Sequence, residues 1–145
     1  MEGFIRYINR IRRCLNLYRT KQMKGEKIDG FQYGYILRIC RNPGILQDQL
    51  SKEFYVNKSN VARHLMSLEK NGYIYRLPKE DDRRSLQVFP TEHALLVLPL
   101  LEQTTREWKK VVFADLSEEE SEIFMRTLVQ IADKAAALVE SEAEL

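Results

Sequence analysis

The sequence predicts a mainly α-helical fold of the α+β class, in which one β-hairpin interrupts a series of helices. Three observations support this fold class. Apolar residues recur every three to four positions through most of the chain, a spacing typical of amphipathic helices. Between residues 73 and 90 the period shortens to two, and aromatic and β-branched residues become frequent. A length of 145 residues, 44% of them hydrophobic and 30% charged, suits one globular domain.

The first helix is expected from Met1 to about Lys21, because its apolar residues share one face and its arginines lie on the other. Those apolar residues are Phe4, Ile8, Ile11, Leu15 and Tyr18. The stretch 24–30, "KGEKIDG", contains two glycines and predicts a loop. A second helix should run from about Phe31 to Arg41 and stop before Pro43 and Gly44.

Two shorter helical segments follow. The first covers residues 46–54, "LQDQLSKEF", where Leu46, Leu50 and Phe54 are four positions apart. The second begins after Asn57, a favourable N-cap residue, and ends near Gly72. Its apolar stripe consists of Val61, Leu65 and Leu68.

The hairpin is predicted from two strands, residues 73–79 and 86–90, joined by the six charged and polar residues 80–85. Two short helices joined by a tight turn and followed directly by a hairpin form a winged helix-turn-helix. The sequence therefore predicts this core with further helices on both sides of it.

The C-terminal part is expected to be helical. Thr91 can cap a helix that continues to about Ala114. Pro99 inside it should kink the helix or at least remove one backbone hydrogen bond. The stretch 117–120, "SEEE", is a capping box that opens a last helix. The apolar face of that last helix comprises Ile123, Phe124, Leu128, Ile131, Ala135 and Leu138.

The net charge of +2 is unevenly placed. Residues 1–90 hold 18 Lys and Arg against 9 Asp and Glu, whereas residues 91–145 hold 5 against 12. The first part therefore carries +9 and favours a polyanionic partner, and the second carries −7. The longest apolar run, residues 94–101, is too short to cross a membrane, and the N-terminus lacks a signal-peptide pattern. We therefore expect a cytoplasmic protein.

Neither a metal site, a disulfide nor a cofactor is expected. Cys14 and Cys40 form no CxxC pair, and the two histidines, His64 and His93, are distant from them in sequence. Catalytic motifs such as G-x-S-x-G, a Gly-rich phosphate loop or H-E-x-x-H do not occur, so an enzyme is not expected. His64 and Cys40 should pack in the fold, and His93 should be solvated in the first turn of its helix.

A recognition helix buries one side and offers the other to the DNA major groove. At about 100° per residue, Ser59 and Arg63 point away from the apolar stripe, with Asn60 beside them. Ser, Asn and Arg side chains hydrogen-bond to base edges, and Lys58 in the first turn can reach a phosphate. An ordinary surface helix would show the same pattern, but the helix before it and the hairpin after it favour DNA binding.

Residues 44–94 resemble the DNA-binding core of the MarR family of bacterial transcriptional regulators. The stretch "VNKSNVARHLMSLEKNGYI" is similar to the recognition helix of that family and its run into the wing. "DRRSLQVFPT", residues 82–91, resembles the wing pattern of D-x-R, five residues and Leu-Thr. Pro90 replaces the usual Leu, which predicts an early end of the strand, and Tyr55 replaces a frequent Gly, which predicts a looser turn. Ala94 also replaces a frequent Gly.

The resemblance implies one MarR-like domain over residues 1–145. Its winged helix-turn-helix core would cover residues 30–92, and residues 1–22 and 93–145 would form dimerisation helices. An obligate homodimer would bind a pseudo-palindromic operator in double-stranded DNA, usually as a repressor. The implied contacts are Ser59, Asn60 and Arg63 in the major groove, Lys58, Lys79 and Arg83 on the backbone, and Arg84 in the minor groove. Arg84 would be held by a charge-assisted hydrogen bond to Asp82.

Two signals remain open for the release of DNA. The resemblance implies either a small aromatic or anionic ligand between the dimerisation helices and the core, or cysteine oxidation. Cys14 and Tyr18 are one helical turn apart, which resembles the one-cysteine organic-peroxide sensors of the family, although Cys14 also suits packing in a dimer interface. Tyr33 and Tyr35 suit either a ligand pocket or the core. A winged helix used for protein–protein contact is the alternative to DNA binding, and the basic charge of residues 1–90 disfavours it.

Overall fold

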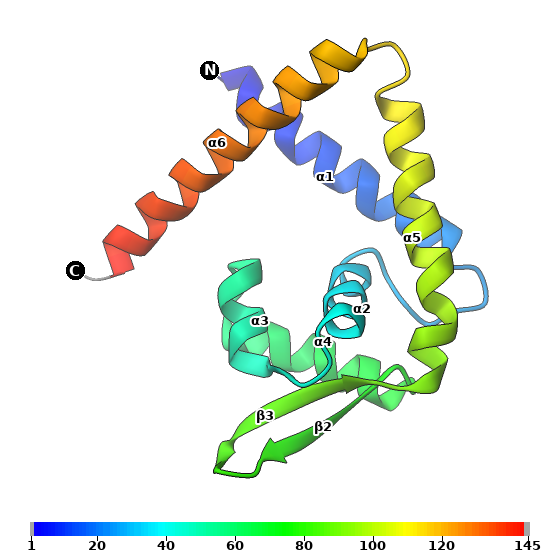
Figure 1. Ribbon diagram of the computed structural model, residues 1–145, viewed down its shortest axis with the longest axis vertical. Helices are drawn as coiled ribbons and strands as arrows, with labels where there is room; N and C mark the ends of the chain where they lie inside the picture. Colours follow the sequence, from blue (N-terminus) through cyan, green and yellow to red (C-terminus); the bar gives the residue numbers. More distant parts are fainter. Residues whose placement is uncertain (1, 144–145) are drawn as a thin grey trace. The chain divides into compact units, whose positions relative to one another are not determined.

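The computed structural model describes residues 2–143 and contains, within that range, six helices and a three-stranded antiparallel sheet. Figure 1 shows α1 (Glu2–Gln22), α2 (Gln32–Arg41), β1 (Ile45–Leu46), α3 (Gln47–Phe54), α4 (Lys58–Lys70), β2 (Ile74–Lys79), β3 (Asp82–Pro90), α5 (Glu92–Val112) and α6 (Glu118–Ala143). The predicted fold class is confirmed. The chain forms two compact units, residues 1–106 and residues 107–145, and each is described by itself. Among the helices of residues 2–143, none has the length and apolar character needed to span a lipid bilayer.

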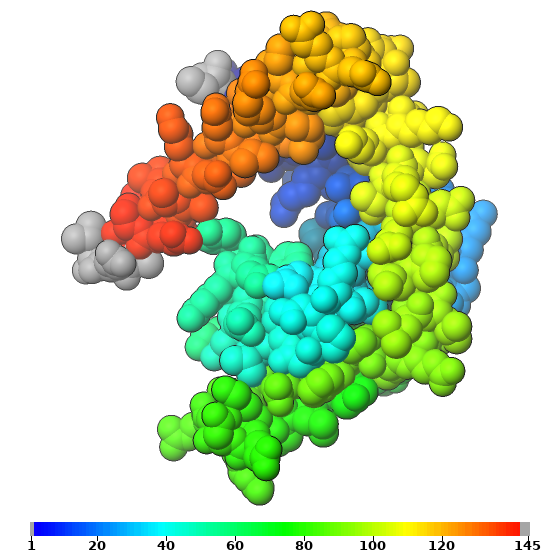
Figure 2. Space-filling view, in the orientation of Figure 1, coloured from blue at the N-terminus to red at the C-terminus, as the bar shows by residue number. Residues whose placement is uncertain are grey.

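The sheet is built around the hairpin, and its strand order is β1-β3-β2. Arg76 of β2 lies opposite Val88 of β3, and Ile45 of β1 pairs with Val88 from the other side. The sequence did not predict β1, because a strand of two residues has no recognisable period. This short strand places the beginning of α3 directly beside the hairpin, which projects from its unit as the wing (Figures 1 and 2).

The core of the first unit lies between its helices and the inner face of the sheet. Val61, Leu65 and Leu68 of α4 are fully buried, so the predicted stripe of that helix is confirmed. Tyr33 and Tyr35 are buried as well and belong to the same core, and Cys40 packs against it as expected. Other large buried side chains are Tyr73, Ile36, Ile39, Ile45, Leu50, Leu101 and Val88.

The turn of the wing is shorter than the sequence predicted. Residues 82–85 belong to β3, so Glu80 and Asp81 form the turn between the strands. The prediction of a six-residue loop was wrong, because the charged residues 82–84 and Ser85 already belong to the strand. An antiparallel ribbon that faces water accepts charged side chains readily.

Two further local expectations were wrong. β3 does not end before Pro90, which lies opposite Ile74 as the last residue of the strand, a place where few ladder bonds need its missing N–H. Tyr55 does not loosen its turn, because it ends α3 in the left-handed conformation with φ 51°. This backbone costs a non-glycine residue about 1–2 kcal/mol.

The predicted helix caps are confirmed. Thr91 Oγ1 accepts a hydrogen bond from the amide of Ala94 at 3.3 Å, at the start of α5. Ser117 Oγ accepts from the amide of Glu120 at 3.1 Å, and the Glu120 carboxylate accepts from the amide of Ser117 at 2.8 Å. These reciprocal bonds complete the capping box that opens α6. Pro99 lies inside α5, which continues past it.

His93 is half exposed, but it is bonded to other elements rather than simply solvated. Its Nε2 lies 2.8 Å from Glu26 Oε2, and its ring packs on Tyr73 with centroids 4.9 Å apart. The Tyr73 hydroxyl donates to the same Glu26 carboxylate and accepts from the Lys27 amide at 2.9 Å. This cluster ties the α1–α2 loop to the beginning of α5, a contact that sequence reasoning did not find.

Helices α1 and α6 leave their apolar residues exposed within their own units. No described residue of either helix is buried. The exposed large apolar residues of α1 are Phe4, Ile5, Tyr7, Ile8, Ile11 and Leu17, and those of α6 are Ile123, Phe124, Met125, Leu128, Val129, Ile131, Leu138 and Val139. Apolar faces of this extent on a protein surface mark a contact with another molecule.

Candidate nucleic-acid interface

Helix α4 is positioned by its cap and its buried stripe. Asn57 Oδ1 accepts the amide of Asn60 at 2.8 Å, which satisfies one of the free N–H groups at the helix start. The helix ends at Lys70, and Gly72, two residues later, has a φ of 82°, a left-handed value that favours glycine. Because three apolar side chains hold one side in the core, the opposite side of the helix is turned to solvent.

The solvent side of α4 carries the side chains that the sequence assigned to base contacts. Ser59 and Arg63 are exposed, and Asn60 is half buried beside them. The Ser59 hydroxyl donates to Asn57 Oδ1 at 2.9 Å, so the cap also orients this serine. The geometry brings these three residues to one face, as a helix that enters a groove requires.

Lys58, the first residue of α4, forms an ion pair with Asp48 of α3. The two side chains are 3.5 Å apart and 74% and 61% exposed. An ion pair this exposed is weak and screened by salt, so a phosphate can replace Asp48 as the partner of Lys58. The two helices of the helix-turn-helix are thus bridged at the surface where DNA would approach.

The wing tip contains an irregularity that displays its arginines. Leu86 of β3 lies opposite Pro78, but the next pair joins Lys79 to Asp82, so residues 83–85 have no paired residue on β2. The Asp82 carboxylate accepts from the backbone amide of Arg84 at 3.1 Å and from the Ser85 hydroxyl at 2.9 Å. Asp82 thus binds the backbone of Arg84, whereas the sequence led us to expect a bond that holds the arginine side chain.

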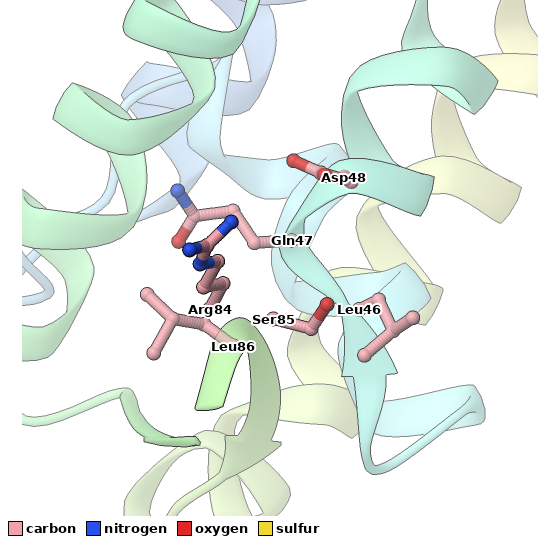
Figure 3. A pocket seen from close by; sticks show the side chains of 6 residues that line it. All are labelled: Leu46, Gln47, Asp48, Arg84, Ser85 and Leu86. Atoms are coloured by element: carbon pink, nitrogen blue, oxygen red, sulfur yellow. The ribbon is translucent and has the colours of Figure 1, made fainter. Parts of the chain in front are cut away.

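The side chain of Arg84 borders a small cleft between the wing and α3. The cleft has a volume of about 80 Å³ and is lined by Leu46, Gln47, Asp48, Arg84, Ser85 and Leu86. Figure 3 shows Arg84 extending from β3 towards Gln47. Arg84 is exposed, so its guanidinium can leave the cleft and reach into a groove of DNA.

The remaining charges of the wing lie at its turn. Lys79 Nζ is 3.5 Å from Asp81 Oδ1, while Arg83 and Glu80 are exposed. Lys79 therefore has an acidic neighbour in the free protein, as Lys58 has.

Sequence reasoning missed an arginine that links the wing to both helices of the helix-turn-helix. Arg76 of β2 donates two side-chain hydrogen bonds to Glu69 of α4 and one to Gln47 of α3. The signal was available: the period of two in β2 puts Arg76 on the same face as the buried Ile74, and an inward arginine needs a partner. The sequence did not indicate that Glu69 and Gln47 are the partners, since both lie outside the strand.

A protein-family model described as the MarR family matches residues 32–86, the stretch that holds α2, both helices of the helix-turn-helix and most of the wing. The chain is also 31% identical over 131 residues to an uncharacterized HTH-type transcriptional regulator, YybA, of Bacillus subtilis strain 168. The match covers 90% of this chain and 87% of that protein.

The chain belongs to the MarR family. Membership makes the protein a transcriptional regulator rather than an enzyme. A MarR transcriptional regulator from Methanosarcina mazei Go1 has a similar structure, with a TM-score of 0.90 at 25% identity over 95% of this chain and 99% of that one. A MarR family regulator from Listeria monocytogenes, solved in complex with a 26mer DNA, gives a TM-score of 0.86 at 26% identity over 92% and 89% of the two chains.

Two cysteines of this MarR family member lie in different surroundings. Cys14 is exposed on α1, one turn before the half-buried Tyr18. Cys40 is half buried in α2, where burial raises the pKa of its thiol and so disfavours the reactive thiolate. Of the two, Cys14 is the accessible thiol.

A half-buried arginine near the end of α1 lies over an aromatic ring. The guanidinium carbon of Arg19 is 4.2 Å from the centre of the Tyr33 ring, and Arg19 Nε is buried without a hydrogen-bond partner. The Tyr33 hydroxyl donates to the Leu101 carbonyl and lies 2.6 Å from Thr105 Oγ1. Tyr33 thereby contacts α1, α2 and α5. The Arg19 guanidinium beside it keeps one N–H group without an acceptor.

Proposed function

We propose that the protein binds operator DNA as a homodimer and represses transcription in the cytoplasm. Helix α4 would enter the major groove with Ser59, Asn60 and Arg63, and the wing would place Arg84 in the adjacent minor groove. The observation that carries this proposal is the polar face of α4, which is turned to solvent beside a wing that displays two arginines. The DNA complex of the Listeria relative supports the same class of partner.

The exposed apolar faces of α1 and α6 support the dimer. Each face belongs to a helix without a buried residue, and burial against a second copy would remove both from water. A two-fold axis would place two α4 helices about 34 Å apart, one turn of B-DNA. The operator would then be a pseudo-palindrome, and the dimerisation helices would be residues 1–22 and 93–145, outside a DNA-binding core at 30–92.

Phosphate contacts are proposed for Lys58, Lys79 and Arg83. Two of them, Lys58 and Lys79, have a carboxylate within 3.5 Å in the free protein. Each such acid competes with phosphate, so it lowers affinity for DNA of any sequence. Asp48 and Asp81 would therefore limit non-specific binding, which depends on phosphate contacts alone.

A small anionic or aromatic ligand is proposed as the signal that releases DNA. Arg19 supports this proposal, because its buried Nε lacks an acceptor and an anionic group could supply one. Oxidation of Cys14 is the second candidate, favoured by the exposure of that thiol. Operator binding measured with benzoate as a probe, and after peroxide treatment of the wild type and of Cys14→Ser, separates the two signals.

Competition binding with Arg63→Ala tests the proposed function. On an operator selected from random DNA, this variant should lose about tenfold or more in affinity, since a good arginine–guanine pair gives about 1–3 kcal/mol of discrimination. Its affinity for scrambled DNA should change little. If wild type and Arg63→Ala bind the operator with equal affinity, α4 does not contact the bases as proposed. If the wild type retards no DNA in a gel at low salt, the result favours a winged helix used for protein–protein contact.

A further inference from the structure

One guanidinium joins the three elements that would face DNA. Arg76 of β2 donates from Nε and Nη2 to Glu69 Oε2, at 3.1 and 2.8 Å, and from Nη1 to Gln47 Oε1 at 3.1 Å. Glu69 lies in the last turn of α4, and Gln47 is the first residue of α3. A single side chain thus connects the wing, the recognition helix and the first helix of the helix-turn-helix.

The backbone of β2 strengthens the same connection. The amide of Arg76 donates to Glu69 Oε1 at 3.2 Å, so both oxygens of this carboxylate are engaged by one residue. Arg76 also lies opposite Val88, a buried residue of the central strand. The end of α4 is therefore held in a fixed place relative to the sheet that carries the wing.

Arg76 is turned inward and does not itself face a groove. Its side chain is 16% exposed, whereas Arg83 and Arg84 are exposed at the wing tip. Gln47, its partner in α3, also lines the cleft into which Arg84 extends (Figure 3). The network therefore extends to the neighbourhood of Arg84, the proposed minor-groove residue.

Stability is a poor explanation for such a network. The Glu69 side chain is 37% exposed, and solvent screens an ion pair of this kind, so it adds little to the free energy of unfolding. A guanidinium instead supplies geometry, because it is planar and its donors form a rigid fork. The directions of its hydrogen bonds to Glu69 and Gln47 fix the angle between α4, α3 and β2.

We propose that Arg76 is a positioning residue for operator recognition: through Glu69 and Gln47 it sets α4 at the angle to the wing at which both enter their grooves together. This inference rests on the proposed function. Base contacts require side chains to be placed within about 0.5 Å, whereas phosphate contacts tolerate displacement. Loss of Arg76 should therefore reduce specific binding more than non-specific binding.

The test compares Arg76→Lys, which keeps the charge and loses the fork, with Arg76→Gln and Glu69→Gln. The matched control is Arg38→Lys, since Arg38 forms a similar fork with Glu53, at 2.7 and 2.9 Å, that contacts neither α4 nor the wing. Affinities for the selected operator and for scrambled DNA of equal length are measured over a series of salt concentrations. Circular dichroism establishes that each variant is folded.

The expected result is a fall of about tenfold or more in the ratio of operator to scrambled affinity for the Arg76 variants, the effect of one misplaced base contact. Scrambled affinity and the salt slope should stay as in the wild type, and Arg38→Lys should change neither. If the Arg76 variants do not fold, the nearly isosteric variant Glu69→Gln tests the inference, and its ratio of operator to scrambled affinity should fall in the same way.

Two results would overturn the inference while the proposed function stands. One is that the wild type prefers its operator and the folded Arg76 variants show the same ratio of operator to scrambled affinity. The other is an equal loss on both DNAs together with a salt slope shallower by about one, which would make Arg76 a direct phosphate contact. A wild type without any sequence preference would overturn the proposed function, and this inference with it.

Discussion

At the scale of single residues, one side chain determines where the recognition helix begins. Asn57 Oδ1 accepts both the amide of Asn60 and the hydroxyl of Ser59. The first bond pairs a free N–H group of the helix start, and the second holds a proposed base-contacting side chain in place. The cap therefore serves both the stability of α4 and the surface that it presents.

Substitution of the cap should destabilise the protein by a measurable amount. Asn57→Ala removes the acceptor and should lower the free energy of unfolding by about 1 kcal/mol. The melting temperature of a chain of this size should fall by about 2–4 °C. Asn57→Ser is the control, because serine caps nearly as well. Equal melting temperatures for the two variants at one protein concentration would show that the cap contributes nothing.

The wing arginine offers a second prediction at this scale. Arg84→Ala should weaken operator binding by about tenfold or more, the effect of losing one specific contact, and leave the melting temperature unchanged. Arg12→Ala, on the exposed surface of α1 outside the winged core, removes the same charge and is the control. Both affinities are measured by fluorescence anisotropy at one salt concentration. If the two variants bind alike, the wing tip has no part in recognition.

At the scale of secondary-structure elements, the cluster of Glu26, Tyr73 and His93 connects the α1–α2 loop to the winged core. The Tyr73 hydroxyl lowers the pKa of Glu26 most, with a smaller contribution from His93, and burial opposes them. Burial and the same hydrogen bond raise the pKa of Tyr73 to about 12. The cluster is therefore most stable when Glu26 is ionised and Tyr73 keeps its proton.

This cluster predicts a pH dependence of stability. A carboxyl whose pKa is lower in the folded state contributes stability above the unfolded pKa of about 4.3 and loses it as the pH falls through the folded value. Chemical denaturation at pH 7 and at pH 3 should show the wild type losing more stability than Glu26→Gln between the two. Glu80→Gln, at the exposed wing turn, should follow the wild type. A constant difference between wild type and Glu26→Gln at the two pH values would contradict the prediction.

Most elements were predictable because their signals are local. A helical period and a cap occupy a few neighbouring residues, so the extents of α1, α2, α3 and α4 were predicted to within about two residues, as was the capping box of α6. β1 was missed because two residues carry no period, and the wing loop was predicted too long because exposed strands tolerate charge. A local sequence pattern thus predicts the presence of a helix or strand better than it predicts the residue at which that element ends.

The contacts between elements were not predictable in the same way. Arg76 is bonded to Gln47, 29 positions earlier in the sequence, and Tyr73 to Glu26, 47 positions earlier. Such partners are brought together by the packing of α4 on the sheet, which no local pattern reports. The exposed residues of α4 were placed correctly, since a helical wheel needs nothing beyond the helix itself. Their contacts with DNA remain predictions.

At the scale of the whole molecule, the apolar faces of α1 and α6 predict a dimer. Wild-type protein should have a mass in solution of twice the 17.1 kDa chain. Leu128 is 38% exposed on α6, so Leu128→Glu should leave the fold of the chain intact and place a charge in the interface. Sedimentation equilibrium should show this variant dissociating at concentrations where the wild type is a dimer.

A control substitution on the polar side of the same helix strengthens the comparison. Asp133→Lys reverses the charge of an exposed residue on the opposite side of α6 without removing an apolar side chain and should leave the dimer intact. Operator affinity should fall together with dimer stability, since one recognition helix contacts half a site. A monomeric wild type, or a Leu128→Glu variant that dimerises as the wild type does, would refute this account of the apolar faces.

The central claim is that two copies of this chain read DNA through paired α4 helices and wings. Selection of binding sites from random duplex DNA by the wild-type protein tests it most directly. The claim predicts one enriched pseudo-palindrome whose half-sites have centres about 10 base pairs apart, or a multiple of one helical turn. Sites without two-fold symmetry, or no enrichment at a salt concentration where the protein still binds DNA, would contradict it.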